Sequence, residues 1–249
     1  MSACLDLINT CAGVASLIDA FGDVKTAIPS LYFDLEGISL GRRGTVSIMQ
    51  VLLYPTNQIY LIDVHTLGTD AFNTPGTAGM TLKEILESES IPKVFFDVRN
   101  DSDALFHHYE IKLAGIYDLQ LMELATRRRQ LPRKHLFGLS SCVERDALLT
   151  TADKGRWKDI KERGLNLFAP ERGGSYEVFN RRPMSDAVMQ YCIQDVKFMP
   201  KLWVRYNSQM TELWKMMVQE ESRNRVGLSQ TSTFNGKGQH MALAPDSFR

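Results

Sequence analysis

The sequence predicts a fold of the α/β class, with a mixed sheet covered by helices. Residues 31–65 hold three short strand-like runs separated by turn-forming sequences, which is the pattern of antiparallel neighbours. From residue 81 onward, helical segments alternate with further strand-like runs, which is typical of parallel crossover connections. The chain has 249 residues, 44% of them hydrophobic and 23% charged, so it can bury a substantial core.

The elements of the first third come in a simple order. Residues 4–22 carry apolar side chains at helical spacing and predict one or two helices. Residues 81–88 predict a short helix, because Thr81 can cap its N-terminus and Glu84 stands at the reciprocal capping position. The three strand candidates between these segments are residues 31–38, 46–54 and 58–65, which are connected by GRRG and PTN.

The later elements alternate between strand and helix. They are a strand at 93–98, a helix that begins near residues 100–102, a strand at 114–117 and a helix at 118–129. Residues 130–183 are rich in charge and are expected to be irregular. A long helical segment spans residues 185–219, and Pro200 predicts a kink near Met199 because proline interrupts the helical hydrogen bonds.

The chain is expected to form one domain over residues 1–219. Residues 220–249 are polar and show little periodicity, so they predict a flexible tail. There is no signal peptide and no apolar run long enough to span a bilayer, so no membrane association is expected. The cysteines form no CxxC pair, which indicates reduced thiols in an intracellular protein of the cytoplasm or nucleus. They are Cys4, Cys11, Cys142 and Cys192.

Two acidic residues interrupt the first strand candidate, LYFDLEG. Asp34 and Glu36 flank Leu35, and side chains two residues apart in a strand point to the same face. Two neighbouring carboxylates repel each other and lose hydration when they are buried, unless a positive charge lies between them. The alternative is a solvent-facing edge strand, in which the pair has no special role.

Further acids occur where the later elements begin. The stretch VFFDVRNDSDALF places Asp97, Asp101 and Asp103 at a strand-to-helix junction, where each could simply cap the helix. In YCIQDV, Tyr191 and Asp195 are four residues apart and share one face of a helix with largely apolar surroundings. Hard cations such as Mg²⁺ and Mn²⁺ prefer carboxylate oxygens, and two such ions form a clamp for in-line attack at phosphorus.

These blocks, in this order, resemble the DEDDy group of 3′–5′ exonucleases, the branch that holds ribonuclease D, the Werner exonuclease domain and Egalitarian-like proteins. The resemblance runs from about residue 8 to about residue 215. It rests on FDLEGISLGRRGTVSIMQV, KVFFDVRNDSDAL, YDLQLMELA and RPMSDAVMQYCIQDVKFMPKLW. The resemblance implies a ribonuclease H-like αβα sandwich with a mixed sheet of five or six strands.

The resemblance also implies site roles. Two divalent ions, Mg²⁺ or Mn²⁺, would be held by Asp34, Glu36, Asp101 and Asp195, and Tyr191 would orient the attacking water. Asp101 is preferred in the second block because it precedes a leucine by four residues, as the family's ligand does. Asp103 and Asp97 are the alternatives there. Before the third block, the resemblance implies a lysine or arginine that helps at the phosphate; Lys154, Lys158 and Lys161 lie there, and Lys154 or Lys158 is the candidate.

Positive charge has to act locally, because Lys plus Arg and Asp plus Glu number 29 each. The arginines around 127–134 and those after the acidic strand could contact phosphates, although a solvated helix end is the plainer interpretation. The candidates are Arg42, Arg43, Arg127, Arg128, Arg129, Arg133 and Lys134.

The leading hypothesis is a metal-dependent 3′–5′ exonuclease that acts on single-stranded RNA or DNA, with RNA slightly favoured. The alternative is a catalytically weak or inactive RNA-binding adaptor or scaffold of the same fold, because some relatives have lost ligand acids. A proofreading subunit is a third class. Homodimerisation or a protein partner is expected to contribute specificity, because few residues follow the last predicted helix.

Overall fold

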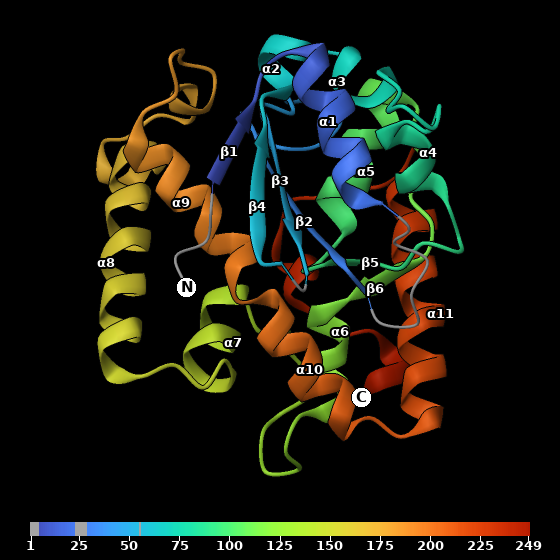
Figure 1. The fold of residues 1–249 in the computed structure, drawn as a ribbon. Helices are drawn as coiled ribbons and strands as arrows, with labels where there is room; N and C mark the ends of the chain where they lie inside the picture. Colours follow the sequence, from blue (N-terminus) through green and yellow to red (C-terminus); the bar gives the residue numbers. More distant parts are fainter. Residues whose placement is uncertain (1–4, 23–28, 55) are drawn as a thin grey trace.

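The computed structural model describes residues 5–22, 29–54 and 56–249, in which a six-stranded sheet carries helices on both faces (Figure 1). The strand order is β1-β4-β3-β2-β5-β6. β2, β3 and β4 are antiparallel, whereas β1 runs parallel to β4, and β5 lies parallel to both β2 and β6. The mixed α/β architecture is therefore confirmed. The strands are β1 Leu5–Ile8, β2 Leu31–Glu36, β3 Ile48–Leu53, β4 Gln58–Ile62, β5 Lys93–Phe95 and β6 Ile116–Asp118.

Alternation along β2 divides the core into two layers. Leu31, Phe33 and Leu35 belong to the apolar cluster under α1 (Cys11–Phe21), α4 (Leu82–Glu87) and α5 (Arg99–Tyr109). Tyr32 belongs to the cluster on the opposite face, under α6 (Leu119–Thr126), α9 (Asp186–Lys197) and α10 (Met199–Gln209). Because side chains alternate, Asp34 and Glu36 lie on the face of Tyr32 and look toward α9.

The N-terminal segment begins with a strand that the helical pattern did not predict. β1 pairs in parallel with β4, and α1 starts only after Thr10, whose hydroxyl accepts the backbone N–H of Gly13 at 3.1 Å. Short apolar runs fit a strand or a helix, and a long-range partner decides between them. The predicted helix over residues 81–88 is confirmed: α4 carries a complete capping box between Thr81 and Glu84.

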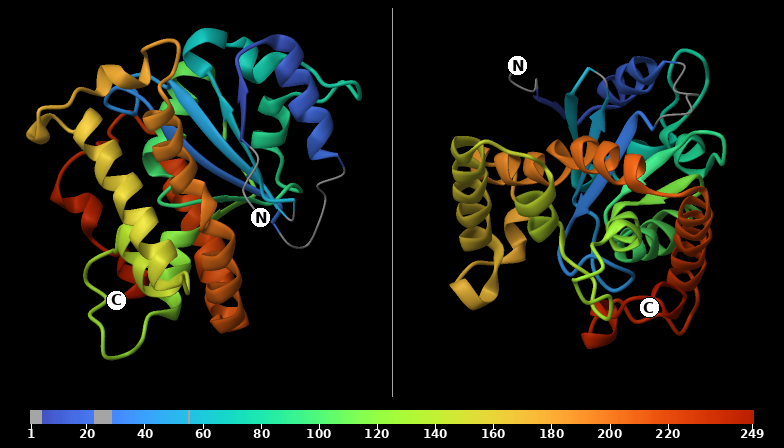
Figure 2. Two further views of the ribbon diagram at one scale, coloured as in Figure 1. Left: turned by 60° about the vertical axis from the view of Figure 1, so that its left-hand side comes forward. Right: turned by 90° about the horizontal axis from the view of Figure 1, so that it is seen from below.

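Residues 130–183 are largely helical, so the prediction of an irregular region is wrong. They form α7 (Leu139–Asp146), α8 (Thr151–Phe168) and two short 3₁₀ turns. Most residues of α8 are polar. The helix lies at one side of the molecule (Figure 2, right). Its buried positions form one narrow stripe, which is a weak signal in sequence. The stripe consists of Trp157, Lys161, Gly164 and Phe168.

The long C-terminal helical segment is divided twice. The predicted kink is confirmed: α9 ends at Lys197 and α10 begins at Met199, directly before Pro200. A second break at Met210 separates α10 from α11, which spans Glu212–Ser229.

The chain beyond residue 219 is ordered and packed, which corrects the expected boundary at 219 and the expected tail over 220–249. α11 runs on to Ser229, and residues 230–249, here called the C-terminal segment, return to the α6–α7 loop. The buried Phe248 packs against Trp214, with 5.3 Å between ring centroids. Few apolar residues anchor this segment, so its sequence resembles a linker although its contacts are specific.

A buried arginine joins α11 to the turn between β5 and α5. Arg225 donates to Asp118 at 2.7 Å and to Gln120 at 3.0 Å. Asp118 in turn accepts the backbone N–H groups of Asp97 at 3.0 Å and Val98 at 3.2 Å. Asp97 has a φ of 59°, a left-handed conformation that a non-glycine residue adopts only when its surroundings hold it. α11 thus helps to hold the turn that precedes Asp101.

Cys11, Cys142 and Cys192 are free thiols, and Cys4 lies outside the described residues. Within the described ranges, no helix combines the length and apolar character that a membrane crossing requires.

Replacing Arg225 tests this support. Arg225→Met should lower the free energy of unfolding by about 3 kcal/mol, because it leaves the buried Asp118 carboxylate without its cation. Urea unfolding followed by circular dichroism measures the change. Arg223→Met is the matched control: Arg223 is exposed and pairs with the exposed Glu220, so its replacement should change stability by less than about 0.5 kcal/mol. Equal effects in both variants would contradict the proposed support.

Candidate active site

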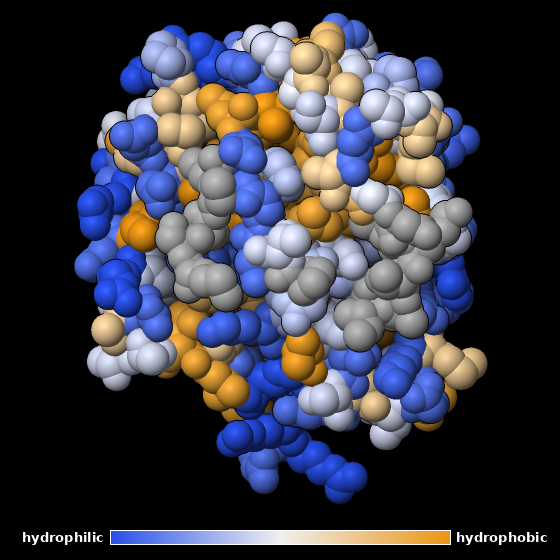
Figure 3. Space-filling model, viewed as in Figure 1, coloured by the Kyte–Doolittle hydropathy of each residue, from blue (hydrophilic) through white to orange (hydrophobic). Residues whose placement is uncertain are grey.

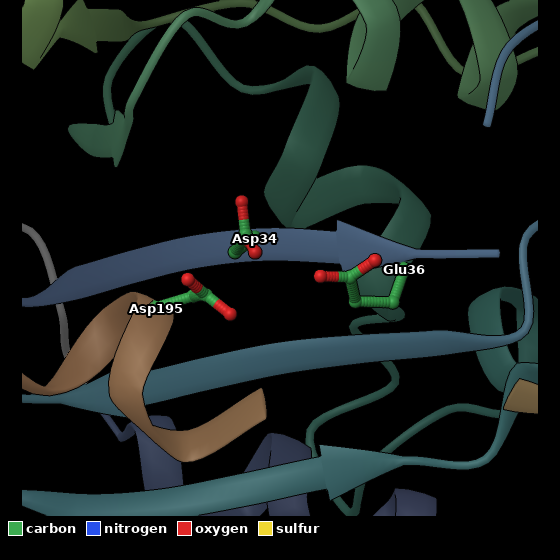
Figure 4. A group of neighbouring side chains, drawn as sticks. All are labelled: Asp34, Glu36 and Asp195. Atoms are coloured by element: carbon green, nitrogen blue, oxygen red, sulfur yellow. The ribbon is translucent and has the colours of Figure 1, made fainter. Parts of the chain in front are cut away.

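Three carboxylates from two elements converge on one face of the sheet. Asp34 and Glu36 come from β2, and Asp195 comes from α9, which packs across β2, β3 and β4. One oxygen of each lies within 4.8 Å of the others. Glu36 and Asp195 turn their carboxylates toward each other beside Asp34 (Figure 4). The pair that looked unfavourable in the sequence is therefore part of a larger acidic cluster.

The hairpin after β2 requires glycine where it closes. A Cβ atom on Gly37 would lie 2.0 Å from the carbonyl oxygen of Thr45, so any other residue would push the two strands apart. The backbone N–H of Ser47 donates to the backbone carbonyl oxygen of Glu36 at 2.8 Å, and the register places Asp34 opposite Gln50. This close contact keeps the two acids in phase, because a slip of one residue would turn both to the other face.

Asp101 lies beside this cluster, in the first turn of α5. It is 6% exposed, and its Oδ1 has no hydrogen-bond partner among the described residues. Its charge helps to raise the pKa of Asp34 and of Glu36, so it is electrostatically part of the same site. Burial, followed by the charges of Asp97 and Asp118, raises the pKa of Asp101 itself to about 8.

The two alternative acids of the second block are occupied by other contacts. Asp103 accepts the backbone N–H of Arg42 at 2.8 Å and its guanidinium at 2.7 Å. Asp97 pairs with Arg99 at 2.6 Å. Asp101 is the acid of this block whose buried oxygen stays unpartnered in the described part of the chain, which favours it as the ligand.

Tyr191 sits one helical turn before Asp195 and is buried at the interface of α8 and α9. Its ring meets Phe168 edge-on, with 4.9 Å between centroids. A Cβ atom on Gly164 would lie 2.1 Å from the Tyr191 ring, so glycine is what allows α8 to approach. Burial, then the charges of Asp195, Glu36 and Asp34, raise the pKa of the Tyr191 hydroxyl, which therefore stays protonated beside the carboxylates.

Lys161, and not the expected Lys154 or Lys158, is the lysine that lies beside the acidic cluster. Its Nζ forms an ion pair with Asp195 and lies 3.7 Å from the centroid of the Tyr191 ring. Lys158 instead pairs with Glu144 at 3.2 Å on the exposed side of α8. The signal for Lys161 was available only once α8 was recognised, because Lys161 occupies the buried stripe that faces α9.

The carboxylates of the cluster are buried and repel one another, so a positive charge would stabilise them. Burial is the main cause that raises the pKa of Asp34, Glu36 and Asp195, and for Glu36 it reaches about 8. Repulsion by the neighbouring carboxylates adds to the rise for Asp34 and Glu36, whereas Lys161 lowers the pKa of all three. One lysine thus offsets only part of the repulsion between several carboxylates.

The donor set fits a hard divalent cation. Every nearby ligand is a carboxylate oxygen, which is what Mg²⁺ and Mn²⁺ prefer. Within the described residues, Asp101 Oδ1 and Asp195 Oδ2 are buried without any hydrogen-bond partner, and a cation would satisfy both. Buried polar atoms are normally paired, so these two oxygens are suited to a bound cation.

The arginines considered for phosphate contact fall into two groups. Arg42 is engaged internally: besides Asp103, it donates to the carbonyl groups of Ser229, Thr231 and Ser232. Arg127 is 4% exposed and is held by Glu123 and by the carbonyl oxygens of Pro132 and His135. These two are structural, which corrects that expectation. Arg43, Arg128 and Arg129 are exposed.

The comparison with protein families decides the assignment. A family model described as 3′–5′ exonuclease matches residues 6–210. The chain belongs to the 3′–5′ exonuclease family. As an exonuclease-family domain, it is also similar to the piRNA biogenesis protein EXD1 of Bombyx mori, with 30% identity over 111 residues. The matched part covers 43% of this chain and 32% of the relative, so the chain spans about a third of that protein.

Solved structures show the same fold for this exonuclease domain. The Trypanosoma brucei RNase D complex with RNA U12 has a TM-score of 0.75 at 18% identity, covering 99% of this chain and 78% of that one. Escherichia coli RNase D, described as an exoribonuclease involved in structured RNA processing, has a TM-score of 0.61 at 20% identity, covering 94% and 52%. The expected ribonuclease H-like architecture is thereby confirmed.

The raised pKa values give a pH test. Glu36 and Asp101 have folded-state pKa values of about 8, above their values in an unfolded chain, so the folded state binds more protons between about pH 4 and about pH 8. In EDTA, the contribution of these two carboxyls to stability should therefore be largest near pH 4 and fall as the pH rises toward 8. Mn²⁺ should restore stability at pH 8, because an ion replaces the protons.

Thermal unfolding at several pH values, with EDTA and with Mn²⁺, measures both effects. In the double variant Glu36→Gln/Asp101→Asn, the fall with pH in EDTA should shrink, and Mn²⁺ should give little protection. A stability that rises between pH 5 and pH 8 in EDTA would show that these carboxyls are not held in their protonated form.

Proposed function

We propose that the protein is a metal-dependent 3′–5′ exonuclease that hydrolyses single-stranded nucleic acid, with RNA as the favoured substrate. The observation that carries this proposal is the convergence of Asp34, Glu36 and Asp195, with the orphan oxygen of Asp101 beside them. A merely structural acidic cluster would be expected to satisfy its buried oxygens with protein donors. Membership of the exonuclease family and the fold shared with an RNA-bound RNase D support the same conclusion.

Asp34, Glu36, Asp101 and Asp195 would hold two divalent ions, Mg²⁺ or Mn²⁺. When bound, the ions activate the attacking water and neutralise charge that develops on the phosphate and the leaving oxygen. The four carboxylates would hold the two ions in place. Without the ions the carboxylates repel each other, and this repulsion favours cation binding. Asp34 and Glu36 hold fixed positions because the strand register and Gly37 set them.

Tyr191 and Lys161 would act on the reacting groups themselves. The Tyr191 hydroxyl stays neutral, so it can donate or accept a hydrogen bond and orient a water for in-line attack. Lys161 pairs with Asp195, and its ammonium group would stabilise negative charge on a phosphate bound beside the carboxylates. Phe168 and Gly164 position Tyr191 and exclude water behind it.

A second candidate function is a catalytically weak RNA-binding adaptor of the same fold. It is favoured by one observation: Lys161 already forms an ion pair with Asp195, so part of the acidic cluster is neutralised within the chain itself. The similarity to proteins named for piRNA biogenesis is compatible with either function.

Nuclease assays on 5′-labelled RNA and DNA separate the two functions. The wild-type protein with Mg²⁺ or Mn²⁺ should shorten single strands from the 3′ end, and EDTA should abolish the ladder. Asp101→Asn should lower kcat on the order of 10²-fold or more, because metal-ion catalysis supplies several kcal/mol. Asp103→Asn is its matched control and should keep most activity, because Asp103 holds Arg42. Binding without any shortening would establish the adaptor.

Lys161 gives an independent test. Lys161→Met should lower kcat about tenfold and tighten Mn²⁺ binding, because it removes both a phosphate contact and a competing charge. Lys158→Met removes the same charge from the exposed side of α8 and should change neither quantity. Titration calorimetry measures Mn²⁺ affinity without turnover, and weaker Mn²⁺ binding in Lys161→Met would contradict the competition.

A further inference from the structure

Two segments of this electrically neutral chain contain no acidic residue. Residues 124–143 hold five cations and no Asp or Glu, and residues 226–245 likewise contain no acid. An acid-free run is unremarkable alone, but two that lie together make a surface of one sign.

The fold places these two segments side by side. The backbone N–H of Leu136 donates to Ala242 at 2.9 Å, and that of Ala244 donates to Lys134 at 3.0 Å. His135 and Leu243 form an antiparallel bridge between the same stretches. Figure 2 shows the C-terminal segment beside the α6–α7 loop. Backbone hydrogen bonds therefore hold the two segments side by side, and their contact does not depend on flexible side chains.

The cations of this surface are free to meet a ligand. We call the exposed Arg128, Arg129, Lys134 and Lys237 the basic rim. Among the described residues, none of these four side chains takes part in an ion pair. The α6–α7 loop reaches the lowest point of the molecule in Figure 1, and the same place in Figure 3 is strongly hydrophilic. Arg127 and Arg42, by contrast, are occupied inside the protein.

The C-terminal segment, which carries Lys237 of the basic rim, contacts the start of α5. Arg99 donates to the carbonyl oxygen of Met241 at 2.8 Å, and a Cβ on Gly236 would lie 2.0 Å from Asn100 Oδ1. Both contacts fall within two residues of Asp101 in the sequence. The C-terminal segment thus connects the start of α5, the helix that carries Asp101, to the α6–α7 loop.

We propose that the basic rim binds the phosphate backbone of a single-stranded nucleic acid, upstream of the 3′ end that enters the carboxylate site. This proposal rests on the proposed function, because it requires a strand to be seated there by its 3′ end. The rim offers charge without an evident aromatic platform, so it contributes affinity for length and little preference for sequence. It explains why the C-terminal segment is folded onto the domain.

The test compares two double variants on oligonucleotides of about 4 and about 16 nucleotides. Arg129→Gln/Lys134→Gln removes two rim charges. Lys83→Gln/Lys112→Gln, the matched control, removes two charges near α4 and the end of α5, away from the rim. Fluorescence anisotropy in EDTA measures affinity without hydrolysis, and steady-state cleavage with Mg²⁺ measures kcat and KM.

The rim variant should weaken binding of the long oligonucleotide at least about tenfold at low salt, and should reduce its salt slope by about 0.7 for each lost phosphate contact. Its KM for the long substrate should rise with kcat unchanged, whereas the short substrate and the control variant should be unaffected. Wild-type affinity of the rim variant for the long strand would overturn the proposal and leave an acidic protein as the partner. If length-dependent binding through the rim is seen without any cleavage, the exonuclease proposal fails and the rim stands.

Discussion

Repulsion among buried carboxylates is the constraint on which this structure depends. Asp34, Glu36 and Asp195 share a space only a few ångströms across, and Asp101 adds its field from the side. Such a group costs free energy in a protein interior unless protons, a lysine or metal ions neutralise it. The rest of the fold supplies the rigidity that prevents these side chains from moving apart. The site therefore favours cation binding, because the surrounding packing keeps the carboxylates close together.

That rigidity comes from contacts distant from the acids themselves. Gly37 permits the tight hairpin that holds two acids in register, and Gly164 lets α8 approach α9 so that Tyr191 is clamped. Arg225, far along the chain on α11, fixes the turn before Asp101 through Asp118. A catalytic constellation needs its supporting residues as much as its ligands, because small displacements cost large factors in rate. Here the last helix of the chain belongs to that support.

Local patterns in the sequence predicted the strand candidates, the capping box of α4, the break before Pro200 and the shared face of Asp34 and Glu36. Each of these follows from side-chain spacing or backbone chemistry within a few residues. β1, α8 and the packed C-terminal segment were missed because their stability comes from partners far away in the sequence. Lys161 was missed for the same reason, since only the recognised helix shows which lysine faces α9.

Neighbouring arginines in this chain have different environments that the sequence does not distinguish. Arg42 and Arg43 are neighbours, as are Arg127 and Arg128, yet in each pair the first is engaged inside the protein and the second is exposed. Composition cannot distinguish them, because both members of a pair have the same charge and the same helical or turn context. What distinguishes them is the presence of buried acceptors such as Asp103 and Glu123, which bind one member of each pair.

Once the internal arginines are set aside, the remaining cations have no acidic neighbour in either of the two segments that form the surface. The exposed charge then serves no evident purpose in folding, since isolated surface charges contribute little to stability. A surface that gains nothing from its charge in the folded monomer is best explained by a ligand of opposite sign. Under the proposed exonuclease function, the nearest such ligand is the remainder of the strand whose 3′ end enters the carboxylate site.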